Sequence, residues 1–302
     1  MRKPDAKTFA TGAAPGGGNY VDQALRRKSA APSAGGEAEP ASGTSIFDPV
    51  LCELAYRWFC PPGGVIVDPF AGGSVRGIVA AKLGRKYHGV DLRPEQIEAN
   101  RAQAARITPD NLPLWYCGDS LMIRDHLAGV EADFVFSCPP YADLEVYSED
   151  PRDLSTMDYE AFRRAYAEII DATCSLLKPD RFACFVVGDL RDKDGMYRGF
   201  PWHTVEAFQR AGLRLYNEAI LVTAIGSLPI RAGKQFQASR KLGKSHQNVF
   251  VFCKGDPIKA VEAIGDVEFG DIEPGTVDLG GALDLPADED LTTDPWDEDA
   301  EH

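Results

Sequence analysis

The chain has 302 residues, of which 44% are hydrophobic, so it is long enough to bury one substantial core. Its formal net charge of −14 lies at one end, because residues 266–302 contain fourteen Asp or Glu and no Lys or Arg. The total charge therefore does not exclude a nucleic-acid substrate. The seven cysteines form no Cys-x-x-Cys pair, which argues against disulfides or a zinc site. With no apolar run of membrane-spanning length, a soluble cytoplasmic protein without a metal is predicted.

The composition divides the chain into three parts. Residues 1–44 are rich in Ala, Gly, Pro and Ser and lack hydrophobic periodicity, which predicts a flexible arm. A catalytic domain is predicted over residues 45–258. Residues 259–302 are predicted to form a disordered acidic tail; the alternative is a DNA mimic that covers the protein's own basic surface.

The middle part opens with a helical pattern over 51–58, which ends at the Pro- and Gly-rich breaker 61–64. Strands and helices then alternate. Strands are predicted at 65–67, 86–90, 114–117, 133–136, 181–187, 213–222 and 248–252, and helices at 74–83, 94–107, 159–177 and 203–211. This alternation predicts an α/β fold with a mostly parallel sheet that is covered by helices on both faces.

Acidic residues follow three successive predicted strands. Asp68 and the pair Gly72-Gly73 follow the first strand, Asp91 ends the second, and Asp119 follows the third. Ligands of open α/β sheets bind beyond the carboxyl ends of the strands, and glycines there permit a tight turn and a close backbone approach. Each Asp alone also suits a turn or a helix cap. As an ordered set, the three acids predict a site for an adenosine cofactor.

Two motifs together carry a family resemblance. The segment 68–74, Asp-Pro-Phe-Ala-Gly-Gly-Ser, is similar to the motif DPFxGxG, and 138–141, Cys-Pro-Pro-Tyr, is similar to (D/N/S)PP(Y/F/W). Both are motifs of the amino-methyltransferases of DNA, which use S-adenosylmethionine to make N6-methyladenine or N4-methylcytosine. The segment around Phe47 resembles the one that precedes the first motif in a circularly permuted class, and residues 246–254 resemble the segment that closes the sheet. The resemblance covers about residues 45–255.

The resemblance implies a seven-stranded, Rossmann-like methyltransferase sheet whose last strand is antiparallel. It also implies two sets of site residues. The catalytic set is Cys138, Pro139, Pro140 and Tyr141; the set that binds S-adenosylmethionine is Phe47, Asp68, Pro69, Phe70, Ala71, Gly72, Gly73, Ser74, Asp91, Leu92, Asp119 and Ser120.

The tetrapeptide suits the chemistry of an exocyclic amine, which is a poor nucleophile because its lone pair is delocalised into the ring. Acceptors for its protons push the nitrogen toward sp³ geometry, and positioning then supplies much of the rate. The double proline stiffens the loop and leaves carbonyls without competing N–H groups. Tyr141 is predicted to stack on a base flipped out of the duplex.

Cys138 departs from the family motif, because a thiol is a weak acceptor. Three roles stay open: an acceptor or spacer, a nucleophile toward a pyrimidine C5 carbon, and an inert structural thiol. Ser137 is adjacent, but a shift of one residue at a strand end turns its side chain to the other face. Asp143 and Glu145 are further candidates for the acceptor.

A basic segment lies between the last two predicted strands. Residues 226–254 contain six Lys or Arg and no acid, with Ser, Gln and one aromatic residue interleaved. This composition predicts a DNA-contacting loop at about 224–247, and the alternative is a solvated basic loop. Residues 142–158 and 188–202, the latter with Arg191, Lys193 and Arg198, are further candidates. The predicted nucleic-acid contacts are Arg231, Lys234, Arg240, Lys241, Lys244 and His246.

The leading hypothesis is therefore an S-adenosylmethionine-dependent DNA amino-methyltransferase, as found in restriction-modification systems. A related enzyme that acts on RNA or on a protein glutamine is the first alternative, and modification of a pyrimidine C5 carbon through Cys138 is another. A catalytically silent DNA-binding homologue is the third. The intact set of Asp68, Asp91 and Asp119 argues against the silent homologue, which has no need of a cofactor site. The oligomeric state is left open.

Overall fold

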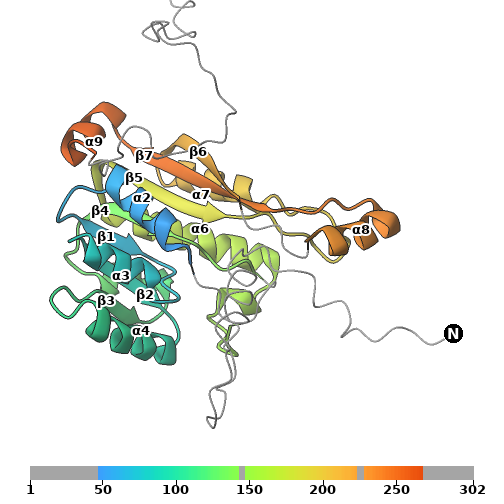
Figure 1. Cartoon of the computed structure of the whole chain (residues 1–302), viewed down its shortest axis with the longest axis horizontal. Coiled ribbons are helices and arrows are strands. Elements are labelled where there is room, and N and C mark those ends of the chain that lie inside the picture. Colours follow the sequence, from blue (N-terminus) through green and yellow to red (C-terminus); the bar gives the residue numbers. More distant parts are fainter. Residues whose placement is uncertain (1–46, 143–146, 223–227, 268–302) are drawn as a thin grey trace, which may run out of the picture. The chain divides into compact units, whose positions relative to one another are not determined.

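The computed structural model describes residues 47–142, 147–222 and 228–267, without the side chains of 229–231 (Figure 1). The predicted arm, 1–44, lies outside these residues, as does the tail from residue 268 onward.

The described residues form one seven-stranded sheet with the order β3-β2-β1-β4-β5-β7-β6. Every neighbouring pair is parallel except those of β7, which runs antiparallel to both β5 and β6. This arrangement confirms the predicted fold class, including the antiparallel last strand. The strands are β1 Val65–Asp68, β2 Lys86–Asp91, β3 Leu114–Cys117, β4 Ala132–Ser137, β5 Leu177–Val187, β6 Arg214–Val222 and β7 His246–Lys254.

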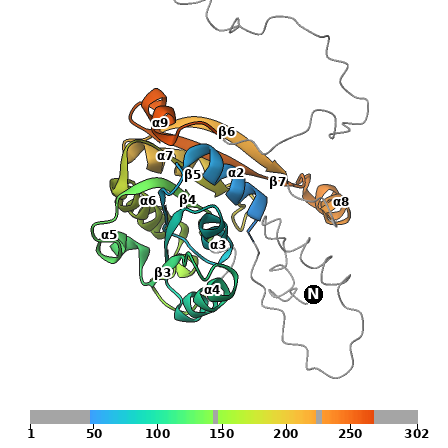
Figure 2. The ribbon, with the colours of Figure 1, turned by 60° about the vertical axis from the view of Figure 1, so that its left-hand side comes forward.

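Helices cover both faces of the sheet (Figures 1 and 2). In the central strands, successive side chains enter opposite cores: Val135 of β4 packs on one side, and Phe134 and Phe136 pack on the other. The core of Phe134 and Phe136 is completed by α2 Pro49–Phe59, α3 Val75–Lys82, α4 Pro94–Ile107 and α9 Pro257–Ile264. The core of Val135 is completed by α5 Ile123–His126, α6 Tyr159–Leu176 and α7 Phe200–Arg210. Short 3₁₀ turns lie at η2 Ser120–Met122 and η4 Leu154–Thr156.

Helix α9 corrects the predicted start of the acidic tail at residue 259. The Asp256 side chain caps this helix by accepting a hydrogen bond from the Ile258 N–H, and Pro257 occupies its first turn. Ala260 and Ile264 are buried in the same core as α2. The packed chain therefore continues at least to Ile264, because these apolar residues bury one face of a capped helix.

A second correction concerns the predicted loop at about 224–247. Residues Leu228–Ser239 form the helix α8, which lies beyond the N-terminal end of β7 in both views (Figures 1 and 2). Pro229 stands in the first turn, where it costs no hydrogen bond, and Ala, Gln, Lys and Arg, all good helix formers, supply half of the helix. Residues 223–227 lie outside the described part.

The strand order reverses between β1 and β4, which are parallel neighbours that connect to opposite sides of the sheet. The carboxyl ends of such a pair form the crevice where open α/β sheets bind ligands. The segments 68–74 and 138–141 both begin at this crevice. In the described part of the chain, no helix has the length and apolar character that crossing a membrane requires.

Candidate functional site

The two sequence motifs are joined by a buried hydrogen bond at the carboxyl ends of β1 and β4. Asp68 is the last residue of β1 and Ser137 the last of β4. The Ser137 Oγ donates to Asp68 Oδ1 over 2.5 Å, and neither residue is exposed to solvent. The Ser137 hydroxyl is therefore buried and bonded to Asp68. It does not replace Cys138 as the acceptor for a substrate amine.

Asp68 is the centre of a buried hydrogen-bond network. Besides Ser137, it accepts from the Phe70 N–H at 3.0 Å, the Arg76 Nε at 2.6 Å and the Tyr87 hydroxyl at 2.7 Å. Its carboxylate is fully buried and engaged within the protein, so in this structure it shapes the loop. A contact of Asp68 with the cofactor stays a prediction.

Arg76, on α3, is a site residue that the sequence reasoning missed. Its Nη2 donates to the carbonyls of Phe70 at 2.5 Å and Ala71 at 3.0 Å, so it holds the loop backbone as well as Asp68. Burial lowers the pKa of Arg76, but the Asp68 carboxylate outweighs this effect and the pKa is raised. The guanidinium also lies 4.8 Å from the ring centroid of Phe47. A single arginine on an otherwise apolar helix face was the available sequence signal.

Phe47 lies beside this network. Its ring packs edge-on against Phe136 of β4, with the centroids 5.7 Å apart. Phe47 is half-buried. It contacts both β4, the strand that leads into the Cys-Pro-Pro-Tyr motif, and Arg76, which holds the backbone of the loop 70–73. A direct contact of Phe47 with the cofactor stays a prediction.

The glycine loop, residues 70–73, is hydrogen-bonded to the protein at Gly72 and has open space beside Gly73. Gly72 has φ +50°, in the left-handed region that glycine tolerates. Its N–H donates to Asp91 Oδ2 at 2.9 Å, and its carbonyl accepts from Asn100 Nδ2 at 2.7 Å. A Cβ atom added to Gly73 would meet no protein atom within 4 Å. Ligand atoms could therefore approach the backbone closely at Gly73.

Asp91 and Asp119 complete the predicted row of acids. Asp91 Oδ1 accepts from the Arg93 N–H at 2.9 Å, and burial raises the pKa of this carboxyl above its ordinary value. A carboxylate has about four acceptor positions, so two remain after the bonds to Gly72 and Arg93. Asp119 is half-buried and caps η2. The adjacent Ser120 donates to the Pro69 carbonyl at 2.5 Å, which joins the third strand end to the first.

These strand ends fit an adenosine cofactor. Two acceptor positions at Asp91 suit the two hydroxyls of a ribose, and the open side of Gly73 suits a close approach of the cofactor. Leu92 is half-buried next to Asp91. Among the residues that the structure describes, no group of three or more His, Cys, Asp or Glu is arranged to hold a metal ion.

In the catalytic motif, Cys138 and Pro140 are half-buried, whereas Pro139 and Tyr141 are buried. The Tyr141 hydroxyl accepts from Gln247 Nε2 at 2.5 Å and lies close to the Cys138 side chain. Burial raises the pKa of Tyr141 well above its ordinary value, and the nearby Cys138 adds to this effect. Gln247, the second residue of β7, was missed because its sequence position gives no sign of this contact.

The position of Tyr141 differs from the predicted stacking role. The residue is 8% exposed, and its ring packs edge-on against Phe200 of α7, with the centroids 6.0 Å apart. Stacking on a flipped base would need this loop to move. The next residue, Ala142, is buried with φ +47°, a conformation that costs a non-glycine residue about 1 kcal/mol. Asp143 and Glu145 lie outside the described residues.

The predicted nucleic-acid contacts fall on α8 and on the chain that leads into β7. Lys234 and Arg240 are exposed, Lys241 and Lys244 are half-buried, and His246 is exposed at the start of β7. The side chain of Arg231 lies outside the described part. The neighbouring Gln247 contacts Tyr141, so the basic segment enters the sheet beside the catalytic motif. Its binding to DNA stays a prediction.

No family model matches the chain. Similar solved structures include TrmN from Thermus thermophilus, with 17% identity over 68% of this chain and a TM-score of 0.46; this chain covers 48% of TrmN, about half its length. A TehB-like SAM-dependent methyltransferase from Corynebacterium glutamicum is 18% identical over 80% of this chain and 100% of its own, with a TM-score of 0.42. Magnesium protoporphyrin IX methyltransferase from Synechocystis PCC 6803, solved with bound SAM, is 12% identical over 68% of this chain and 79% of its own, with a TM-score of 0.43.

Proposed function

We propose that this protein transfers a methyl group from S-adenosylmethionine to the exocyclic amine of a DNA base, either N4 of cytosine or N6 of adenine. The observation that carries the proposal is the hydrogen bond between Asp68 and Ser137. It places the glycine loop and the Cys-Pro-Pro-Tyr loop next to each other at the crevice of the sheet. A methyl donor and a base amine must meet in such a place for direct transfer.

S-adenosylmethionine, when bound, supplies a methyl group on a sulfonium that a nitrogen lone pair can attack. The residues that would hold it are Phe47, the loop 70–73, Asp91 with Leu92, and Asp119 with Ser120. In this assignment, the Asp91 carboxylate accepts the ribose hydroxyls through its two remaining positions. Asp68 and Arg76 act indirectly, by fixing the path of the loop backbone.

The catalytic loop orients the amine of the base. Pro139 and Pro140 have no N–H, so the backbone carbonyls of residues 138 and 139 have fewer competing donors and are suitable acceptors for an amine proton. The Cys138 sulfur adds a weak acceptor, and the adjacent Tyr141 hydroxyl restricts where that sulfur lies. Gln247 and Tyr141 thus act as positioning residues for Cys138. No general base is needed until the methylated nitrogen loses its proton.

Nucleic acid is favoured as the substrate because the cationic chain 240–246 leads directly into the strand that contacts Tyr141. A substrate held by phosphate contacts on this chain would present a base at the catalytic loop. DNA is chosen over RNA on the sequence motifs, which resemble those of DNA amino-methyltransferases.

The test is mass spectrometry of nucleosides after incubation with trideuteromethyl-labelled cofactor. Purified full-length protein is mixed with unmethylated DNA made by amplification in vitro, and parallel samples contain total RNA or a protein extract. We expect labelled N4-methylcytosine or N6-methyladenine in the DNA, and none with the Asp91→Ala variant. Label that appears only in RNA or protein, only as 5-methylcytosine, or in no sample while the cofactor binds, would contradict the proposal.

A further inference from the structure

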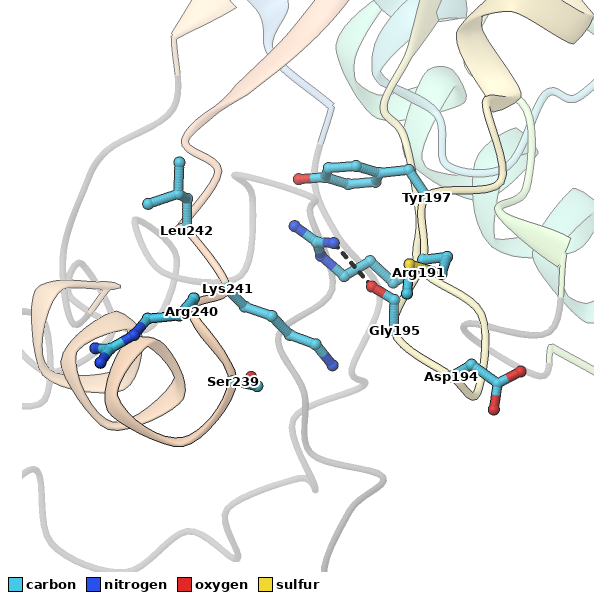
Figure 3. Close-up of a pocket in the computed structure, with 9 residues that line it drawn as sticks. Arg191, Asp194, Gly195, Tyr197, Ser239, Arg240, Lys241 and Leu242 are labelled. Atoms are coloured by element: carbon cyan, nitrogen blue, oxygen red, sulfur yellow. Dashed lines mark hydrogen bonds between the residues drawn. The ribbon is translucent and has the colours of Figure 1, made fainter.

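A cleft of about 490 Å³ lies between the segment 191–197, which follows β5, and the residues 239–242, which precede β7 (Figure 3). The proposed chemistry does not use this cleft. One wall is the 191–197 hairpin, in which Arg191 and Tyr197 form an antiparallel bridge after β5. The other wall is the C-terminal end of α8 and the residues that follow it. The lining residues are Arg191, Asp194, Gly195, Met196, Tyr197, Ser239, Arg240, Lys241 and Leu242.

The charge of the cleft is predominantly positive. Arg191, Arg240 and Lys241 line it, against the single acid Asp194. None of these three cations has an ion-pair partner among the described residues. Lys241 extends across to the hairpin, where a Cβ atom on Gly195 would overlap its side chain. Such a cluster of uncompensated cations has a net attraction for an anion.

One aromatic ring, Tyr197, lines the cleft, and a second ring, Phe236, lies against the lining residue Arg240. The Arg191 guanidinium stacks on the Tyr197 ring at 3.8 Å from its centroid, and the Arg240 guanidinium lies 5.1 Å from that of Phe236. Tyr197 is 46% exposed and Phe236 42% exposed. Cations interleaved with exposed rings are typical of surfaces that follow a nucleic-acid backbone and stack on unpaired bases.

The chain connections place the cleft next to the catalytic loop. The hairpin follows β5 through Gly188, which lies against Tyr141, and through Asp189. Asp189 accepts from the N–H groups of Gly199 at 3.0 Å and Phe200 at 3.2 Å, so it anchors the far end of the hairpin to α7. The other wall leads through Lys244, whose Nζ lies 5.9 Å from the Tyr197 ring, to Gln247 and its bond with Tyr141.

From this arrangement we infer that the cleft binds the sugar-phosphate backbone of the DNA strand beside the methylated base. Arg191, Arg240 and Lys241 contact phosphates, and the Tyr197 ring stacks on a base that is exposed when the target base leaves the duplex. This inference rests on the proposed function, and it extends the DNA contacts proposed at residues 240–246 to Arg191 and Tyr197 of the hairpin. An acidic peptide would use the same cations but would leave the rings without a role.

The test compares cleft variants with matched controls in full-length protein. Arg191→Gln and Lys241→Gln remove cleft cations, whereas Arg106→Gln on α4 and Lys259→Gln on α9 remove exposed cations elsewhere. Binding to a fluorescent duplex of random sequence is measured by anisotropy at several salt concentrations. Each cleft variant should weaken binding about fivefold and lower the slope of log K against log salt by about 1, and the controls should match the wild type.

Tyr197→Ala gives a second, charge-independent measurement. With single-stranded DNA, loss of a stacked base should weaken binding about tenfold.

Equal affinities and salt slopes in the cleft variants and the controls would overturn the inference. Failure of the proposed function has a different signature: wild-type protein would bind DNA in the cleft-dependent way but transfer no methyl group to it. Conversely, normal methylation and an unchanged KM for DNA in Arg191→Gln and Lys241→Gln would leave the proposed function standing and reject the cleft.

Discussion

Ser137 and Asp68 are 69 residues apart in the chain, and their side chains meet at 2.5 Å in the interior of the sheet. Each is the last residue of its strand; Asp68 is also the first residue of the motif 68–74, and Ser137 directly precedes the motif 138–141. Because neighbouring parallel strands end at the same edge, this bond sets the position of the glycine loop relative to the catalytic loop. A change in the position of one loop should therefore also move the other.

This coupling predicts that Ser137→Ala impairs methyl transfer more than cofactor binding. The variant loses a hydrogen bond worth about 1 kcal/mol of stability, and the catalytic loop loses its attachment to Asp68. We expect kcat to fall about tenfold, an effect of the size that a small misplacement of reacting groups produces, with the cofactor Kd within twofold of the wild type. Thr108→Ala, which removes a buried hydroxyl from the C-cap of α4, is the control for stability. Equal kcat in both variants would contradict the coupling.

Asp68 and Asp91 should respond differently to the same substitution. Asp68→Ala leaves the Arg76 guanidinium buried without its carboxylate, which should cost about 3 kcal/mol of unfolding free energy. Asp91→Ala should leave stability within about 1 kcal/mol but abolish measurable cofactor binding. Chemical unfolding and titration calorimetry separate these outcomes. If Asp68→Ala keeps its stability and loses only the cofactor, Asp68 is a ligand after all.

Cofactor binding should weaken in acid because Asp91 must be ionised to accept two hydroxyls. Burial raises the pKa of this carboxyl above its ordinary value of 3.8. The proton therefore returns at a higher pH than on an exposed aspartate, and affinity should fall as the pH decreases through this raised pKa. Calorimetric titrations from pH 7 to pH 4 should show this decrease. Asp91→Asn should bind weakly with no such dependence, and a wild-type affinity that stays constant down to pH 4 would exclude Asp91 as the ribose acceptor.

The fold could be predicted from sequence wherever the signal was local. The buried strand 114–117 and the helix 94–107 have the predicted bounds, because apolar runs, Pro94 and the alternation mark them. Helix α7 starts at Phe200, earlier than predicted, because Asp189 caps it from a distance. The helix in the basic segment was missed because Pro229, Gly233 and the flanking polar residues are typical of a loop.

The residues of the candidate site also fall into two groups, those with a local sequence signal and those without one. The glycine loop and the Cys-Pro-Pro-Tyr loop are contiguous motifs, so they could be recognised in the sequence. Arg76 and Gln247 could not, because each acquires its role only when folding brings it to Asp68 or Tyr141. The same reason applies to the internal bonds of Asp68: an acid at a strand end is expected at a ligand, and only the packing shows these bonds.

Replacement of Cys138 by Ser should retain or raise the methylation rate. A serine hydroxyl is a better acceptor than a thiol, is slightly smaller, and can take the same place beside the Tyr141 hydroxyl. The labelled product should stay N4-methylcytosine or N6-methyladenine. Cys117→Ser, at an exposed thiol, is the matched control. Complete loss of activity in Cys138→Ser, with 5-methylcytosine as the wild-type product, would instead identify Cys138 as a nucleophile.

Asp133 should stabilise the sheet only while it is ionised. Its carboxylate accepts from Lys178 Nζ at 2.8 Å, Arg181 Nε at 3.3 Å and the Val65 N–H at 3.0 Å, so it joins three neighbouring strands. Burial alone would raise the pKa of Asp133, but these hydrogen bonds outweigh it and the pKa is lowered. A lowered pKa in the folded state means that the stabilisation is present above the unfolded pKa of about 3.9 and is lost as the pH falls through the folded value.

Asp133→Asn should therefore lower the unfolding free energy by about 2 kcal/mol at pH 7, because Lys178 and Arg181 lose their anionic partner. Below about pH 4, the difference between variant and wild type should shrink, because the Asp133 carboxyl takes up a proton first in the unfolded state and then, as the pH falls through the lowered pKa, in the folded state. Urea unfolding at pH 7, 5 and 3.5 measures both quantities. Asp171→Asn, which removes an exposed partner of Arg124, should change stability by less than about 0.5 kcal/mol at every pH. A difference for Asp133→Asn that is independent of pH would show that the amide disturbs packing, and that the ionised carboxylate is not what links β1, β4 and β5.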